Sequence, residues 1–150
     1  MADRDYSDSA GLMWPATFDG SEAVEDPHCT IMFLGDASAL RVAPAYILGA
    51  MREFLDAPGQ VAVTGPEVFG NEEKVWVATL DTSALNSLQA GIQEALAAIG
   101  VENQSSFPDY RPHVTIMDAK DETLVPPMPD VVELGEPQVW LGKQRYIAIR

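Results

Sequence analysis

The two histidines of this 150-residue chain stand in the same sequence context. They lie in the segments Pro27-His28-Cys29-Thr30-Ile31-Met32 and Pro112-His113-Val114-Thr115-Ile116-Met117, which match at five of six positions. A random placement of two histidines would rarely put both into one repeated hexapeptide. The repeat therefore predicts one functional element used twice, rather than two structural histidines at strand entrances.

The His-x-Thr spacing has a geometric meaning in a strand. Side chains two residues apart point to the same face, roughly 6 to 7 Å apart along the strand. His28 and Thr30 therefore share one face of a predicted strand, and His113 and Thr115 share one face of another. The residue between each pair points the other way. If the two strands lie side by side about a pseudo-twofold axis, two imidazoles and two hydroxyls converge on one groove.

Two imidazoles beside a phosphorus atom can divide the work of phosphoryl transfer. The neutral imidazole takes a proton from the attacking oxygen, and the protonated imidazole gives one to the leaving oxygen. An unperturbed histidine has a pKa of about 6.5, so both forms are accessible near neutral pH. Threonine hydroxyls can donate to the non-bridging phosphate oxygens. This scheme uses neither a metal nor a cofactor, and two histidines without ligand-spaced carboxylates are a poor zinc site.

Composition narrows the substrates and the cellular location. The formal net charge is −14, from 23 acidic and 9 basic residues, which argues against long nucleic acid and in favour of a small substrate. The single cysteine, Cys29, excludes an intramolecular disulfide and is expected to be a small buried residue. There is no signal-peptide pattern and no apolar run that could span a membrane. We expect a soluble cytoplasmic protein.

The repeated motifs must be held by alternating strands and helices. We expect a flexible N-terminal arm at residues 1–10 and one domain over residues 11–150. Hydrophobic periodicity predicts helices at residues 37–55 and 83–99. Apolar runs bounded by turn residues predict strands at residues 11–18, 28–34, 60–68, 74–80, 113–117, 131–134 and 139–149.

The paired motifs resemble those of the 2H phosphoesterase superfamily. The similarity extends to the strand before the first motif, the helix before the second, the approach Tyr110-Arg111-Pro112 and the last strand. The resemblance implies an α+β fold with two pseudo-symmetric lobes of antiparallel sheet and helices on the outside. It also implies that His28 and His113 act as base and acid, in an order left open. Thr30 and Thr115 would then be phosphate ligands.

The activity implied is metal-independent cleavage of a small nucleotide phosphodiester. Cyclic nucleotides, cyclic oligonucleotides and 2′-5′ linkages are the substrate classes. The short loops are similar to those of compact phage-encoded members, which would make a defence-signalling nucleotide a substrate. RNA-end processing, by 2′,3′-cyclic phosphate hydrolysis or 2′-5′ ligation, is the alternative enzyme. A non-catalytic nucleotide-binding module is the alternative outside enzymology, and the oligomeric state is left open.

Five residues outside the motifs are candidate substrate contacts. Arg111 would point into the groove if its strand began early, although Pro112 can break that register. Tyr110 and Phe107 could stack on a base, although core packing or a simple loop anchor is the more common role for each alone. Trp76 and Trp14 stand in predicted strands and could line the pocket, with core packing as the alternative for each.

Overall fold

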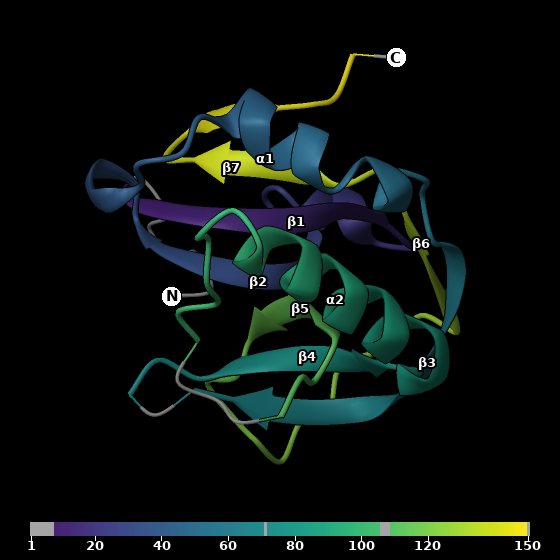
Figure 1. Ribbon diagram of the computed structural model, residues 1–150. Coiled ribbons are helices and arrows are strands. Elements are labelled where there is room, and N and C mark those ends of the chain that lie inside the picture. Colours follow the sequence, from purple (N-terminus) through teal and green to yellow (C-terminus); the bar gives the residue numbers. More distant parts are fainter. Residues whose placement is uncertain (1–7, 71, 106–108, 150) are drawn as a thin grey trace.

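The computed structural model describes residues 8–70, 72–105 and 109–149, which form strands, two α-helices and short 3-10 turns (Figure 1). The strands are β1 (Ser9–Thr17), β2 (His28–Asp36), β3 (Gly59–Phe69), β4 (Val75–Leu80), β5 (His113–Asp118), β6 (Val131–Leu134), β7 (Gln138–Leu141) and β8 (Gln144–Tyr146). The α-helices are α1 (Pro44–Ala50) and α2 (Thr82–Ala97), and the 3-10 turns are η1 (Ser21–Ala23), η2 (Ala37–Ala39) and η3 (Arg52–Phe54). Of the predicted arm, residues 1–7 lie outside the described residues, and β1 already begins at Ser9.

The strands pair antiparallel in two groups that β6 connects. One group has the order β2-β1-β7-β8, and the other has the order β3-β4-β5. Strand β6 pairs with the end of β1 and with the start of β3, so a continuous path of hydrogen-bonded strands joins both groups. This arrangement confirms the α+β class with antiparallel sheet, and it places each motif strand at the outer end of its group.

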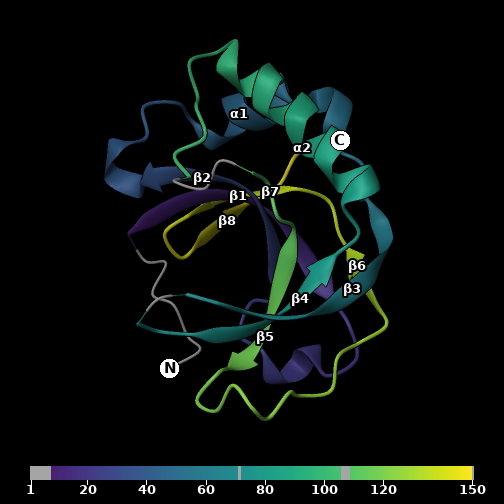
Figure 2. The same cartoon turned by 90° about the horizontal axis from the view of Figure 1, so that it is seen from below.

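The two helices cover one side of the strands. Figures 1 and 2 show α1 beside β7 and α2 beside β2, which agrees with the contacts between these elements. The buried Gln89 of α2 donates to the Ile31 carbonyl oxygen of β2 at 3.3 Å, which ties the helix to the first motif strand. The helix begins at its Asp81 cap, whose carboxylate accepts from the Ser83 backbone N–H at 3.0 Å.

The hydrophobic core cluster lies between the helices and the strands. It includes residues from every strand group, with Trp14 of β1 and Leu80 of β4 both 1% exposed, and from the inner faces of α1 and α2. Cys29 of β2 and Val114 of β5 also belong to this cluster, and both are 0% exposed. Because strand side chains alternate, the opposite faces of β2 and β5 point away from the core and away from both helices.

Two predicted elements differ from those observed. The helix predicted at 37–55 is divided into η2, α1 and η3, because Pro44 has no N–H and fits only the first turn of a helix. The strand predicted at 139–149 is instead the β7–β8 hairpin, in which Gly142 turns the chain with φ of 62°. Within the described residues, no helix is long and apolar enough to cross a membrane.

Candidate active site

Both motifs form strands that begin at their histidine. In β2 the pattern alternates between a partly exposed His28 and Thr30 and a buried Cys29. In β5 it alternates between a partly exposed His113 and Thr115 and a buried residue between them. The strand geometry expected from the His-x-Thr spacing is therefore present in both places.

The two motif strands approach each other at the seam between the strand groups. Cα atoms of β2 and β5 come within 8 Å of one another. The Tyr110 hydroxyl, three residues before the second histidine, donates to the Thr30 carbonyl oxygen at 2.7 Å. The same hydroxyl lies 3.7 Å from the Cys29 sulfur, beneath the strands. The two motifs are thus in direct contact through buried and partly buried groups.

The two histidine rings are held in the same way. The distance between His28 Nδ1 and the Asp26 carbonyl oxygen is 2.8 Å, and the distance between His113 Nδ1 and the Arg111 carbonyl oxygen is also 2.8 Å. A carbonyl oxygen can only accept, so Nδ1 carries the hydrogen in both rings. This fixes Nε2 as the nitrogen that takes up or gives up a proton in each histidine.

The first ring belongs to a cluster that we call the His28 half-site: Asp26, His28, Thr30, Trp140 and Arg145. The imidazole and the Trp140 indole have centroids 4.5 Å apart, with an interplanar angle of 60°. The Arg145 guanidinium carbon lies 3.8 Å from the Trp140 ring centroid, a cation–π distance. The guanidinium also pairs with the Asp26 carboxylate at 3.3 Å.

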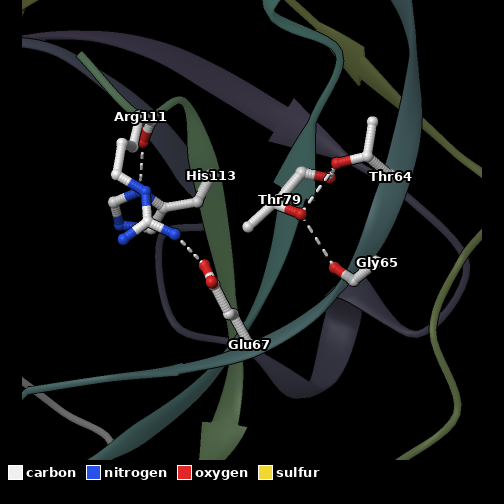
Figure 3. Close-up of polar contacts among 6 residues, drawn as sticks. All are labelled: Thr64, Gly65, Glu67, Thr79, Arg111 and His113. Atoms are coloured by element: carbon white, nitrogen blue, oxygen red, sulfur yellow. Dashed lines mark hydrogen bonds and ion pairs between the residues drawn. The ribbon is translucent and has the colours of Figure 1, made fainter. Parts of the chain in front are cut away.

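The second ring belongs to the His113 half-site: Glu67, Phe69, Arg111, His113 and Thr115 (Figure 3 shows three of these residues). The imidazole and the Phe69 ring have centroids 4.5 Å apart and meet edge to face at 69°. The Arg111 guanidinium carbon lies 4.7 Å from the Phe69 centroid, and the guanidinium pairs with the Glu67 carboxylate. Each half-site therefore consists of a histidine, a neighbouring aromatic ring, an arginine over that ring and a carboxylate.

A bulge in the neighbouring strands supports the His113 half-site. The register of β3 and β4 shifts between Val63 and Gly65, which leaves Thr64 as the extra residue. The Thr79 hydroxyl donates to the Gly65 carbonyl oxygen at 3.1 Å and lies 2.8 Å from the Thr64 hydroxyl (Figure 3). Because Thr79 is the β4 partner of His113, these bonds fix the strand on which the histidine rests.

Of the predicted substrate contacts, Arg111 lies beside His113, whereas Tyr110, Trp14 and Trp76 are packed away from the motif histidines. Tyr110 is packed against the core, with its hydroxyl bonded to Thr30, so its ring is not an open stacking surface. Trp14 is 1% exposed because it pairs with Cys29 and faces the core. Trp76 is 6% exposed and lies at the far end of β5 from the histidine. Phe107 lies outside the described residues.

The sequence did not indicate the aromatic neighbours of the two histidines. Trp140 is 4% exposed and stands within the strand predicted at 139–149, whereas Phe69 lies just after the strand predicted at 60–68. Arg145, in the same predicted strand as Trp140, is half-buried over the Trp140 ring. One sequence signal was available: Asp26 and Arg111 occupy the same position, two residues before each histidine, and carry opposite charges.

Two titratable groups near the seam have strongly shifted pKa values. Burial raises the pKa of the Cys29 thiol to about 11, with hydrogen bonds from Tyr110 and the His113 backbone acting in the other direction. Burial also raises the pKa of the Tyr110 phenol, and the neighbouring Cys29 adds to this. Both groups are therefore protonated near neutral pH and act as structural neighbours of the site. Among the described residues, no cluster of three or more His, Cys, Asp or Glu side chains could hold a metal ion.

Comparison with known proteins places the chain among phosphoesterases. An RNA 2′,3′-cyclic phosphodiesterase of Geobacillus stearothermophilus is 30% identical over 95 residues, which are 61% of this chain and 30% of that protein. An RNA 2′,3′-cyclic phosphodiesterase of Thermus thermophilus is 27% identical over 111 residues, which are 70% of this chain and 55% of that protein. The matched regions thus span about a third and about half of the length of these relatives.

The family assignment comes from a match to a family model, and solved structures give matches as well. The crystal structure of TT0787 of Thermus thermophilus matches with a TM-score of 0.48 at 18% identity, covering 87% of this chain and 83% of that one. The model of the 2′-5′ RNA ligase superfamily, whose members are 2H phosphoesterases, matches residues 13–143. That range includes both His-x-Thr motifs and nearly the whole chain, so the protein belongs to the 2′-5′ RNA ligase superfamily.

Proposed function

We propose that the protein is a phosphodiesterase in which His28 and His113 act as general acid and general base on a small nucleotide phosphodiester. The observation that carries this proposal is the matched geometry of the two imidazoles. Each donates Nδ1–H to a carbonyl oxygen at 2.8 Å and so presents the same nitrogen for proton transfer. A module that only binds a nucleotide has no need for two histidines held in the same tautomer.

The reaction balances with water as the only co-substrate. One histidine accepts a proton from the attacking water at Nε2 as the new P–O bond forms. The other donates the proton on its Nε2 to the leaving ribose oxygen as the old P–O bond breaks. Thr30 and Thr115 donate to the non-bridging oxygens, where negative charge grows in the transition state. No step in this scheme requires a metal ion or an organic cofactor.

A terminal 2′,3′-cyclic phosphate is the first substrate to test. Two relatives carry the name RNA 2′,3′-cyclic phosphodiesterase, and a strained cyclic phosphodiester suits in-line attack with one acid and one base. The net charge of −14 favours a short substrate over a long RNA, because a long polyphosphate is repelled. The Arg111 guanidinium, 54% exposed and over the Phe69 ring that contacts His113, can supply positive charge to a small anion.

The test is a panel of phosphodiesters incubated with the purified protein in the presence of a chelator. The panel contains 2′,3′-cyclic mononucleotides, a long RNA with the same cyclic end, 2′-5′ oligoadenylate, and cyclic mono-, di- and trinucleotides. We expect turnover of 2′,3′-cyclic mononucleotides, with a higher kcat/KM than for the long RNA. Cleavage of a cyclic oligonucleotide instead would move the substrate class to nucleotide signals, including those of anti-phage defence.

Two outcomes would contradict parts of the proposal. Loss of turnover in chelator, restored by a divalent cation, would refute the metal-independent mechanism. Tight nucleotide binding without turnover would favour the binding module. The double variant His28→Ala/His113→Ala is the control, because any activity that it retains comes from a contaminant or from a different site.

A further inference from the structure

Tyr110 connects the two half-sites from an unexpected position in the sequence. It stands in the segment that leads into the second motif, yet its hydroxyl donates to the carbonyl oxygen of Thr30 in the first motif at 2.7 Å. Its ring packs against the core cluster, and the hydroxyl lies 3.7 Å from the Cys29 sulfur. A partly buried hydroxyl with a short bond and a packed ring has little freedom to move.

The neighbouring residue in the same segment holds the other half-site. The Arg111 carbonyl oxygen accepts the Nδ1–H of His113 at 2.8 Å. Two consecutive residues therefore fix both motifs, one through a side chain on Thr30 and the other through the backbone on His113. Any displacement of this dipeptide changes the distance between the phosphate-binding hydroxyl of Thr30 and the proton-transferring ring of His113.

Thr30 needs such a partner because of its place in the sheet. Strand β2 pairs with β1 and with no other strand among the described residues. The backbone groups on its outer edge therefore have no neighbouring strand to bond with. On that edge the Thr30 carbonyl oxygen is bonded by Tyr110, and the Phe33 carbonyl oxygen is bonded by the Gln104 backbone N–H at 2.7 Å. The contact at Thr30 lies within the motif, whereas the contact at Phe33 lies three residues beyond it.

We infer that Tyr110 is a positioning residue, which sets the placement of Thr30 relative to His113 through its hydrogen bond to the Thr30 backbone. This inference rests on the proposed function, because it concerns the geometry of the same reaction. The phenol does not touch the phosphate and does not titrate near neutral pH, since burial raises its pKa. Its contribution is to hold two groups from distant parts of the chain in one arrangement.

Tyr110→Phe is the direct test, because it removes the hydroxyl and keeps the ring in the core. We expect kcat to fall by about 10- to 100-fold with little change in KM, since a small misplacement of reacting groups affects the chemical step more than binding. Tyr46→Phe is the matched control, because Tyr46 lies on α1, is 61% exposed and is remote from both motifs. An unchanged kcat in Tyr110→Phe would overturn the inference.

A second control separates positioning from loss of stability. Val132→Ala removes a fully buried side chain of β6 and destabilises the fold without touching either half-site. Assayed at a temperature where both variants remain folded, Val132→Ala should keep the wild-type kcat and Tyr110→Phe should not. Equal losses of kcat in the two variants would show that Tyr110 acts only through stability.

A double-mutant cycle tests whether Tyr110 acts through Thr30. If it does, adding Tyr110→Phe to Thr30→Val should lower kcat by less than twofold further. Adding Tyr110→Phe to Thr115→Val should keep its full effect, because the phenol bonds to the first motif and not to Thr115. Full additivity with Thr30→Val would refute the mechanism by which Tyr110 is inferred to work.

A readout without substrate keeps this inference separate from the proposed function. The chain contains only two histidines, so its imidazole NMR signals are two resolvable sets. We expect Tyr110→Phe to shift the His28 signals and Tyr46→Phe to leave both sets unchanged. If the wild-type protein cleaves nothing in the phosphodiester panel, the proposed function fails, while these signals still decide whether Tyr110 positions the first motif.

Discussion

Besides a threonine, the His28 and His113 half-sites each contain a histidine, an aromatic ring, an arginine and a carboxylate. They differ in which of the two charged residues precedes the histidine. In the first, the residue two before the histidine is the carboxylate Asp26, and the arginine comes from the distant β8. In the second, the residue two before the histidine is Arg111, and the carboxylate Glu67 comes from the distant β3. Each ion pair therefore joins a motif to a strand on its own side of the molecule.

The two arginines also differ in how firmly they are held. The Arg145 side chain is 28% exposed and donates to the carbonyl oxygens of Gly142 at 2.8 Å and Gln144 at 3.3 Å, in addition to its pair with Asp26. The Arg111 side chain is 54% exposed, and its guanidinium pairs with Glu67. Exposed ion pairs contribute at most about 1 kcal/mol, so a phosphate can compete with Glu67 for Arg111.

This difference suggests a division of labour between the half-sites. The His28 half-site is a packed unit in which Trp140, 4% exposed, contacts both its histidine and its arginine. The His113 half-site keeps its guanidinium near the solvent, where a substrate phosphate can reach it. The two half-sites would then contribute alike to proton transfer but differently to phosphate binding. The variant pairs below test these two statements separately.

The largest expected effects test whether both half-sites contribute to proton transfer. We expect His28→Ala and His113→Ala each to lower kcat by about 10²- to 10⁴-fold, because each removes one proton-transfer group. The wild-type profile of kcat/KM against pH should have two limbs, and each variant should lose a different one. The variant that loses the acidic limb lacks the general base, which settles the order of the two roles.

Two results would contradict the expectation that both histidines transfer protons. Retained activity in both single variants would show that the reaction occurs elsewhere. Loss of the same limb in both would mean that one proton transfer dominates and that the second histidine only binds. Circular dichroism of both variants is the control for folding, since each substitution removes a ring packed against Trp140 or Phe69.

Smaller effects are expected from the two arginines, and they should differ in kind. Arg111→Ala should raise KM about tenfold with a smaller change in kcat, because a charge-assisted phosphate contact is worth about 1.5 kcal/mol or more. Arg145→Ala should instead lower kcat and the free energy of unfolding, because it removes the support of Trp140 and hence of His28. Steady-state kinetics and urea unfolding of both variants check the split.

Glu67→Gln tests phosphate binding at the His113 half-site more directly than Arg111→Ala does. It keeps the shape of the side chain but removes the charge that competes for Arg111, so KM should fall by a few-fold at low ionic strength. Asp26→Asn, the equivalent change on the other side, should leave KM unchanged, because Arg145 keeps its carbonyl partners. If KM responds equally to both carboxylates, the proposed asymmetry in binding is wrong.

The local part of the site could be predicted from the sequence, because strand periodicity is a short-range rule. It separates His28 and Thr30 from Cys29, and the structure has the same alternation in both motifs. The α2 helix was also predicted closely, since its apolar stripe and its Asp81 cap are local signals. The α1 region was not, because an apolar stripe does not reveal how strictly Pro44 stops the helix.

The neighbours of the histidines could not be predicted, because they depend on strand register. Trp140 reaches His28 from β7, which pairs with β1 rather than with β2, and Phe69 reaches His113 from β3 across β4. Neither pairing is encoded in the spacing of the motifs. For Tyr110 the sequence left base stacking and core packing open, and the structure has the core packing. Nothing local indicates that its hydroxyl bonds to Thr30 across the seam.

The last expected effect concerns stability rather than turnover, at the middle residues of the two motifs, Cys29 and Val114. These residues occupy equivalent buried positions, but only the thiol titrates. Burial raises the pKa of Cys29 from 9.0 to about 11. Between these values the unfolded chain has lost the thiol proton while the folded chain keeps it, so stability falls as the pH rises. The stability contributed by the thiol is thus fully present below pH 9 and is lost on approaching pH 11, an effect on the order of 2 kcal/mol.

Cys29→Ala isolates this term. Urea unfolding at several pH values should show that wild type loses more stability than the variant between pH 9 and pH 11. Tyr110 contributes in the same direction in both proteins, because burial raises its pKa as well, so the difference between wild type and variant reports Cys29. Parallel curves would mean that the thiol titrates alike in the folded and unfolded chains. That result would contradict the burial of the Cys29 side chain, 0% exposed, in the hydrophobic core beneath the first motif.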